Sequence, residues 1–191
     1  MIKAIIFDYY GVLTTDSYLT WLDRHAQVTA EHASEIEQLS KAQDEGIDDA
    51  EFFSRLAAIA DEPAERIQAE FNIHGVAHRG LINYIRHLRR KGLETAILSN
   101  ADISLYNQIT GHGWNKLFEV ILCSGEAGVT KPDPKIFRMV LSRLDVLPAE
   151  ALFVDDREYN VQGALAAGIE GIHYTGLTNF KAELIARGID R

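Results

Sequence analysis

Chemically useful side chains stand directly after three apolar runs and at the start of one predicted helix. Asp8 follows Ala-Ile-Ile-Phe, Ser99 follows Thr-Ala-Ile-Leu, and the pair Asp155 and Asp156 follows Ala-Leu-Phe-Val. Lys131 stands before Pro-Asp-Pro, a sequence typical of a helix start. Carboxylates beside a lysine and a hydroxyl suit a phosphate ester and a hard cation such as Mg²⁺. A carboxylate can then form an aspartyl phosphate, while the lysine and the hydroxyl bind the phosphoryl oxygens.

Asp8 also has a purely structural explanation. Gly11 follows it closely, and an aspartate in such a place can simply cap a tight turn. Taken alone, Asp8 is equally consistent with a turn and with a catalytic group. However, the carboxyl ends of parallel strands share one edge of a sheet, where open α/β folds bind their ligands. If the apolar runs are parallel strands, the chemically useful residues can converge there.

The segments around these residues alternate between strand and helix patterns. Helical spacing of apolar residues is clear at Ile136, Phe137, Val140 and Leu141. Short apolar runs predict strands near residues 4–7, 95–98, 118–122, 151–154 and 171–174. We therefore expect an α/β fold, a Rossmann-like parallel sheet covered by helices on both faces.

Residues 17–78 are an exception, because they contain helix patterns and no good strand candidate. Thr29 is predicted to cap one helix, and Asp48-Asp49-Ala50-Glu51 has the form of a capping box before the next. The apolar stripe that begins at Phe52 and Phe53 indicates a helix face that packs on its neighbours. This part of the chain is therefore predicted to be a small inserted helical unit.

The composition limits the class of protein. The chain has 191 residues, 47% of them hydrophobic, which is typical of a globular protein. Its net charge of −9 argues against nucleic acid or an anionic membrane as the main partner. The single cysteine, Cys123, excludes an internal disulfide and suits a small buried residue. The N-terminus has no basic region followed by a long apolar stretch, so we expect a cytoplasmic protein of unknown oligomeric state.

Four motifs in order carry a resemblance to a known family. They are Asp8-Tyr9-Tyr10-Gly11-Val12, Leu98-Ser99-Asn100, Lys131-Pro132-Asp133-Pro134, and Val154-Asp155-Asp156 through Asn160. This set resembles the four motifs of the haloacid dehalogenase-like hydrolases, and the resemblance covers nearly the whole chain. It implies a Rossmann-like catalytic core at residues 1–14 and 79–191. A small α-helical cap at residues 15–78 would be inserted after the first motif.

The resemblance also implies an activity and a role for each motif residue. The activity is that of a Mg²⁺-dependent phosphatase that hydrolyses a small phosphorylated metabolite through an aspartyl-phosphate intermediate. Asp8 would be the catalytic nucleophile, assisted by Ser99 and Lys131, which bind the phosphoryl group. Asn100 and Tyr10 would help to bind the substrate. The implied ligands of Mg²⁺ are Asp8, Asp155, Asp156 and the backbone carbonyl of Tyr10.

One departure from the family pattern, at Tyr10, keeps two alternatives open. Phosphatases of this family usually carry a second aspartate there, which protonates the leaving group and later activates water. A tyrosine, with a pKa near 10, is a poor base at neutral pH. The metal-independent 2-haloacid dehalogenases of this superfamily carry a tyrosine there and use the same aspartate nucleophile. The second alternative is a non-catalytic binding or regulatory protein that keeps the fold.

Other residues favour the phosphatase. Dehalogenases typically have Ser and Asn where this chain has Asp155 and Asp156, and two adjacent acids without a cation would repel each other. Arg24 is the only arginine between residues 20 and 46, and no clear match to the arginine-containing segment of dehalogenases surrounds it. Residues 45–53 look more similar to the sugar-phosphate phosphatase branch.

Overall fold

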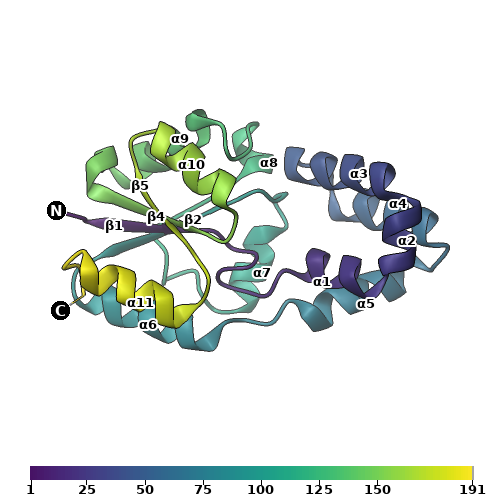
Figure 1. The fold of residues 1–191 in the computed structure, drawn as a ribbon, viewed down its shortest axis with the longest axis horizontal. Helices are drawn as coiled ribbons and strands as arrows, with labels where there is room; N and C mark the ends of the chain where they lie inside the picture. The colour runs from purple at the N-terminus through teal and green to yellow at the C-terminus, as the bar shows by residue number, and fades with distance from the viewer. Residues whose placement is uncertain (191) are drawn as a thin grey trace.

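A five-stranded parallel sheet forms the centre of the computed structural model, which describes residues 1–190 apart from the side chains at positions 45, 73 and 74 (Figure 1). The strands lie in the order β3-β2-β1-β4-β5. Their bounds are β1 Ala4–Phe7, β2 Glu94–Ser99, β3 Val120–Cys123, β4 Ala151–Asp155 and β5 Glu170–His173. Because β1 pairs in parallel with both β2 and β4, the carboxyl ends of these three strands lie side by side.

Helices cover both faces of the sheet (Figure 1). One face packs against α6 Arg79–Arg90, α7 Leu105–Gly111 and α11 Leu177–Ala186, and the other against α9 Pro134–Leu144 and α10 Glu158–Ala166. Alternate residues of β1 serve the two faces: Ile5 and Phe7 belong to one apolar cluster, Ala4 and Ile6 to the other. This is the pattern of a strand buried on both sides. The short elements are α8 Ser124–Ala127 and a 3₁₀ turn at Pro148–Glu150.

Five further helices pack against one another beyond the carboxyl ends of the strands, and we call them the cap (Figure 1). They are α1 Ser17–Arg24, α2 Ala26–Glu31, α3 Ala33–Glu45, α4 Asp49–Ala60 and α5 Ala64–His74. Their interior is an apolar cluster of Trp21, Leu39, Phe52, Phe53, Leu56 and Ile67. Two adjacent segments connect the cap to the sheet, because Thr14 pairs with Ala77 and the Thr15 amide donates to the Val76 carbonyl over 2.9 Å.

The predicted α/β fold is confirmed, and each predicted strand overlaps an observed one. Two predicted helix starts are also confirmed by their caps. The Asp48 carboxylate accepts a hydrogen bond from the Glu51 amide over 2.8 Å at the start of α4. The Asp133 carboxylate accepts from the Lys135 amide over 2.8 Å at the start of α9. Local capping chemistry therefore locates these two boundaries without help from tertiary contacts.

The predicted cap at Thr29 is wrong. Thr29 lies inside α2, and the next helix begins only at Ala33. Its hydroxyl lies 3.0 Å from the carbonyl oxygens of both Leu22 and His25. A threonine hydroxyl can cap the start of a helix, or it can donate a hydrogen bond to a carbonyl group that precedes it in the chain. The Thr29 hydroxyl does the second.

The division into a core and a cap at residues 14–15 and 78–79 stays a prediction. The last residue of the predicted core, Arg191, lies outside the described residues. Within residues 1–190, no helix combines the length and the apolar character that a membrane crossing requires.

Candidate active site

Asp8 stands at the centre of the carboxyl edge of the sheet. Directly before it, Phe7 pairs with Ile97 of β2 and with Val154 of β4. The Asp8 amide donates to the Val154 carbonyl over 2.8 Å, which extends the strand pairing by one residue. Its carboxylate accepts a hydrogen bond from the Tyr9 amide over 2.7 Å, and the residue is only 6% exposed. The strand therefore holds the carboxylate in a fixed and nearly buried position.

Lys131 joins two of the predicted site residues through its ammonium group. Its Nζ lies 2.8 Å from Asp8 Oδ1 and 2.7 Å from Asp155 Oδ2, and all three residues are buried. Burial opposes the charge of the lysine, but the carboxylates of Asp155 and Asp8 raise its pKa above the ordinary value. The ammonium is therefore charged at neutral pH and holds the two acids together.

Amide groups fix this lysine and Asp155 in place. The Lys131 amide donates to Asn100 Oδ1 over 2.8 Å, and Asn100 Nδ2 donates to the Lys131 carbonyl over 3.1 Å. Asn160 Nδ2 lies 3.1 Å from both carboxylate oxygens of Asp155. The Arg157 amide donates to Asp155 Oδ1 over 2.8 Å. Both oxygens of Asp155 are thus engaged, and its carboxylate acts as an anchor for the lysine.

Three carboxylates next to this anchor form a candidate metal centre. Asp8, Asp155 and Asp156 each offer an oxygen, and these atoms lie within 4.8 Å of one another. Burial raises the pKa of Asp8 to about 7 despite the opposing charge of Lys131. Burial and the charge of Asp155 likewise raise the pKa of Asp156. Asp156 Oδ1 is buried and has no hydrogen-bond partner within residues 1–190. Crowded acids with an unpartnered oxygen fit a divalent cation that prefers oxygen ligands.

Ser99 and Tyr10 lie on the wall of the same cavity as Asp8. Ser99 is 1% exposed, and its hydroxyl has no hydrogen-bond partner in the described part of the chain. The Tyr10 hydroxyl accepts a hydrogen bond from Gln108 Nε2 over 3.0 Å. Burial raises the pKa of Tyr10 above its ordinary value, although the bond from Gln108 opposes this shift. Tyr10 is therefore neutral at physiological pH, and Ser99 keeps a free donor for a ligand.

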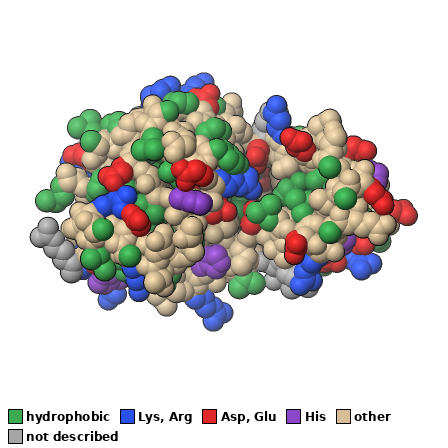
Figure 2. All heavy atoms as spheres, in the orientation of Figure 1, with side chains coloured by type: hydrophobic (Ala, Val, Ile, Leu, Met, Phe, Trp, Pro, Cys, Tyr) green, Lys and Arg blue, Asp and Glu red, His purple; other side chains and the backbone are tan. Residues whose placement is uncertain are grey.

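The cavity has a volume of about 570 Å³ and lies between the sheet edge and the cap. Figure 2 shows charged side chains of both signs along the seam between these two parts. The predicted site residues on its wall are Asp8, Tyr10, Ser99, Asn100 and Lys131. Asp155 and Asp156 are beside Asp8 rather than on the described wall. The structure thus brings all the predicted site residues to one edge of the sheet.

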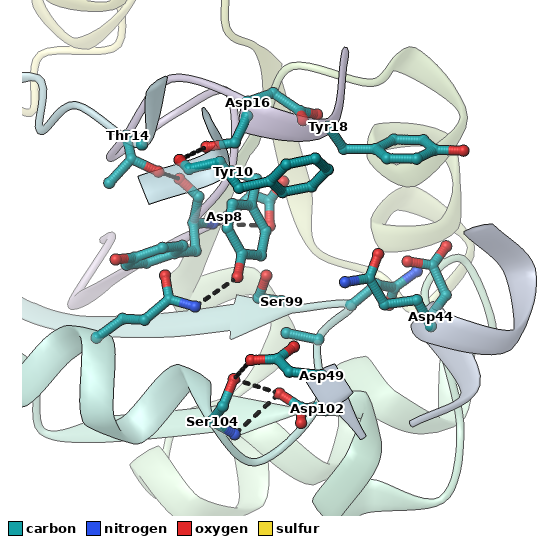
Figure 3. A pocket seen from close by; sticks show the side chains of 18 of the residues that line it. Asp8, Tyr10, Thr14, Asp16, Tyr18, Asp44, Asp49, Ser99, Asp102 and Ser104 are labelled. Carbon is teal, nitrogen blue, oxygen red and sulfur yellow. Dashed lines mark hydrogen bonds between the residues drawn. The ribbon is translucent and has the colours of Figure 1, made fainter. Parts of the chain in front are cut away.

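Several wall residues were not predicted as site residues. Asp44 and Asp49 come from the cap and face the cavity (Figure 3). Ser104 Oγ, from the loop before α7, lies 2.7 Å from Asp49 Oδ2. Arg157 Nη2 lies 3.3 Å from Asp16 Oδ2 at the base of the cap. The sequence marks Asp49 only as part of a helix start, because no local pattern reveals a contact with a residue 55 positions away.

Family membership follows from a comparison with models of protein families. The model of the haloacid dehalogenase-like hydrolases matches residues 2–168. The chain belongs to this family. It is accordingly a hydrolase, as its four motifs predict.

Relatives of this haloacid dehalogenase-like hydrolase include curated phosphatases. A phosphoserine phosphatase from Thermus thermophilus is 38% identical over 91 residues, which are 47% of this chain and 36% of that protein. The match thus spans about a third of the length of that relative. A sesquiterpene phosphatase from Aspergillus oryzae is 28% identical over 183 residues, which cover 91% of this chain and 90% of that protein.

A solved structure has the same fold. It is a haloacid dehalogenase family enzyme from Bacteroides thetaiotaomicron in complex with magnesium and inorganic phosphate. The TM-score is 0.70 at 21% sequence identity, and the match covers 90% of this chain and 93% of that one. At this level of identity the similarity concerns the fold.

Proposed function

We propose that this haloacid dehalogenase-like hydrolase is a Mg²⁺-dependent phosphatase that forms an aspartyl phosphate on Asp8. The observation that carries the proposal is the buried contact of Lys131 with both Asp8 and Asp155. Asp155 holds the Lys131 ammonium group in place. The positive charge of the lysine therefore stays next to Asp8 and next to an anion bound beside Asp8. A carboxylate, an ammonium and a free hydroxyl on one cavity wall suit an anionic phosphoryl group.

The residues of the wall have distinct roles in the proposed reaction. A carboxylate oxygen of Asp8 attacks phosphorus, and the bond from phosphorus to the leaving oxygen breaks. The Lys131 ammonium and the Ser99 hydroxyl hold the phosphoryl oxygens, while Asn100 keeps the lysine backbone in place. Water then attacks phosphorus of the aspartyl phosphate, which restores the Asp8 carboxylate and releases inorganic phosphate.

The carboxylates beside Asp8 fit a magnesium ion. Asp8 and Asp156 would hold it, with the Tyr10 carbonyl as a further oxygen donor, while Asp155 stands beside them with its oxygens bonded to Lys131, Asn160 and the Arg157 amide. The unpartnered Asp156 Oδ1 and the raised pKa values of Asp8 and Asp156 support this donor set. When bound, Mg²⁺ offsets the repulsion between a carboxylate and an anionic phosphate.

The substrate is proposed to be a small phosphorylated metabolite. The cavity of about 570 Å³ falls within the range of small-molecule sites. Two curated relatives are named as phosphatases of small molecules, one of phosphoserine and one of a sesquiterpene. Polar side chains of the cap, among them Gln43, Gln68 and Asn72, line this cavity. They suit a leaving group with hydroxyl groups better than a purely apolar one.

A dehalogenase of this family would have the same fold, so only the residues of the site can distinguish it from a phosphatase. Three clustered carboxylates would repel the carboxylate of a haloacid if no cation were bound. Arg24, the one arginine of the expected segment, is exposed on α1 and is not on the described cavity wall. The non-catalytic alternative has no explanation for a buried lysine that is bonded to a cavity-facing Asp8. These observations favour the phosphatase.

One experiment compares the two chemistries directly. We expect the protein to hydrolyse p-nitrophenyl phosphate with Mg²⁺ and to lose this activity with EDTA. Asp156→Ala should weaken Mg²⁺ binding and abolish the activity together, whereas Asp23→Ala, at an exposed position on α1, should retain both. Release of chloride from 2-chloropropionate in EDTA, without phosphatase activity, would instead establish the dehalogenase. Absence of both activities across a panel of phosphorylated metabolites and haloacids would favour the non-catalytic alternative.

A further inference from the structure

The proposed reaction needs a proton for the leaving oxygen, and Tyr10 is a poor source. Burial raises the pKa of Tyr10, so loss of its proton would leave a buried phenolate. Its hydroxyl already accepts a hydrogen bond from Gln108. The second aspartate that family phosphatases usually carry at this position is absent. For a poor leaving group such as an alkoxide, another source of the proton is needed, and the carboxyl groups of the cavity wall are candidates.

The contacts of Ser104 are consistent with a proton on a carboxyl group of this wall. Ser104 Oγ lies 2.7 Å from Asp49 Oδ2 and 2.6 Å from Asp102 Oδ1, and the Ser104 amide donates to Asp102 Oδ1 over 2.9 Å (Figure 3). A serine hydroxyl has one proton, so it can donate to only one of the two carboxyl groups. The other contact is satisfied when a carboxyl group donates to the hydroxyl oxygen. Protonation of one of the two aspartates would therefore satisfy both contacts, and this protonation is part of the proposal made below.

Asp49 is the better carrier of this proton. Asp102 Oδ1 also accepts the Ser104 amide over 2.9 Å, so Asp102 already has a second donor besides the Ser104 hydroxyl. Burial raises the pKa of Asp49, although the bond to Ser104 opposes the shift, and the charges of Asp102 and Asp48 raise it further. The other titratable group that faces it, from the segment after β1, is the neutral Tyr10. Each charged group named here thus favours the protonated form of Asp49.

The other cap carboxylates of the cavity lie beside cations. Asp16 is 3.3 Å from Arg157. For Asp44, burial raises the pKa, but Arg157 and Lys131 oppose the shift, and Asn100 contributes a hydrogen bond that also favours the anion. Asp49 alone among these three wall residues has only acids as charged neighbours. It is therefore the cap carboxyl group best suited to be a proton donor.

The cavity also offers a ligand position next to this acid. Asp49 lines the same cavity as Asp8 and Ser99, whose buried hydroxyl has no partner within residues 1–190 and is free for a phosphoryl oxygen. Asp49 stands in the first turn of the cap helix α4, and Figure 3 shows it beside Ser104 and Asp102 of the loop before α7. A substrate whose phosphoryl group lies on Ser99 and Lys131 would extend its leaving group toward the cap. The proposal therefore requires the leaving oxygen to come within reach of Asp49 in the bound substrate.

We propose that Asp49 is the general acid and base of this site, in the place of the missing aspartate at position 10. The inference rests on the proposed phosphatase function. As the bond from phosphorus to Asp8 forms and the bond to the leaving oxygen breaks, the Asp49 carboxyl proton passes to that oxygen and an alcohol departs. The Asp49 carboxylate then takes a proton from the water that attacks the aspartyl phosphate. Phosphate is released, and both aspartates return to their starting states.

The test compares Asp49→Asn with the parent on two substrate types. An alkyl phosphate needs protonation of its leaving oxygen, whereas p-nitrophenolate departs without it. Because kcat/KM reports the steps up to departure of the leaving group, we expect Asn at this position to lower kcat/KM for the alkyl phosphate by about 10²–10⁴-fold. For p-nitrophenyl phosphate the loss should stay below about tenfold, with a burst of p-nitrophenol before slow turnover. Asp23→Asn is the matched control, because it makes the same change at an exposed position of the cap helix α1 and Asp23 is not among the groups that shift the pKa of Asp49.

The pH dependence of kcat/KM gives a second readout, which would not change if Asp49 had only a structural role. A general acid must be protonated, so kcat/KM for the alkyl phosphate should fall as the pH rises through the pKa of Asp49. This fall should be absent in Asp49→Asn. Asp102→Asn removes a negative charge that raises the pKa of Asp49, so the fall should move to lower pH.

The possible results separate this inference from the proposed function. Equal losses on both substrates, or no loss, in a folded and Mg²⁺-binding Asp49→Asn protein would overturn the role of Asp49 and leave the phosphatase intact. An unmoved pH profile in Asp102→Asn would also contradict it. A parent protein that hydrolyses neither phosphate ester would refute the phosphatase itself, and the role of Asp49 with it.

Discussion

Replacement of Gly11 by alanine would test whether the turn after Asp8 shapes the metal centre. Gly11 has a φ of +78°, and a Cβ atom at this position would lie 2.3 Å from Asp156 Oδ2 and 2.6 Å from Asp156 Cγ. Both distances are far below van der Waals contact. Either the turn or the Asp156 carboxylate must therefore move in Gly11→Ala.

The size of the effect has two parts. A non-glycine residue in the left-handed region costs about 1–2 kcal/mol, which corresponds to a fall in Tm of about 2–8 °C for a chain of this length. The second part is local, because the displaced Asp156 carboxylate is a proposed ligand of Mg²⁺. Loss of ligand orientation typically costs about 10–100-fold in metal affinity. We therefore expect Gly11→Ala to need at least about tenfold more Mg²⁺ for half-maximal activity.

Gly92→Ala is the matched control. Gly92 has a φ of +91°, and no atom lies within 4 Å of the Cβ position. This variant should lose a similar amount of stability with no change in its Mg²⁺ requirement. The measurements are Tm with and without Mg²⁺, and turnover of p-nitrophenyl phosphate over a range of Mg²⁺ concentrations. An unchanged Mg²⁺ requirement in Gly11→Ala would refute the argument that this turn holds the Asp156 carboxylate in place at the metal centre.

Three further predictions follow from named contacts. Asp8→Asn should fold but lose turnover, because an amide is no usable nucleophile; turnover within about tenfold of the parent would exclude Asp8 as the attacking group. Tyr10→Asp, introduced into Asp49→Asn, should raise kcat/KM on alkyl phosphates more than on p-nitrophenyl phosphate, and an unchanged ratio would show that an acid at position 10 cannot reach the leaving oxygen. The pKa of Asp190 is lowered to about 2, mainly by hydrogen bonds from the lysine and tyrosine that it contacts. Its contribution to stability is present above the ordinary pKa of 3.8 and lost as the pH falls toward 2, so Asp190→Asn should flatten the dependence of Tm on pH in this range.

Strand periodicity and helix capping are local properties, and they predict much of this fold. The apolar runs before Asp8, Ser99 and Asp155 form β1, β2 and β4, and the predicted alternation with helices is observed. In a parallel sheet the ends of neighbouring strands share an edge, so the convergence of these residues follows from the element order alone. Thr29 shows the limit of such reasoning. Its hydroxyl can form a hydrogen bond either at the start of a helix or with a preceding carbonyl group. Which of these bonds forms depends on the packing of the cap.

The sequence by itself determined the sheet edge and the motif residues on it, because each belongs to a local pattern of strand, turn or cap. Only the tertiary structure decided what faces them across the cavity. The contact of Asp49 with Ser104 joins α4 of the cap to the loop before α7, and it exists only because the cap lies over the carboxyl ends of the strands. Helical periodicity indicates that one face of α4 is apolar, but it does not indicate which core loop meets its first turn. That docking removes Asp49 from bulk water and sets it among other acids, and both effects raise the pKa of its carboxyl group.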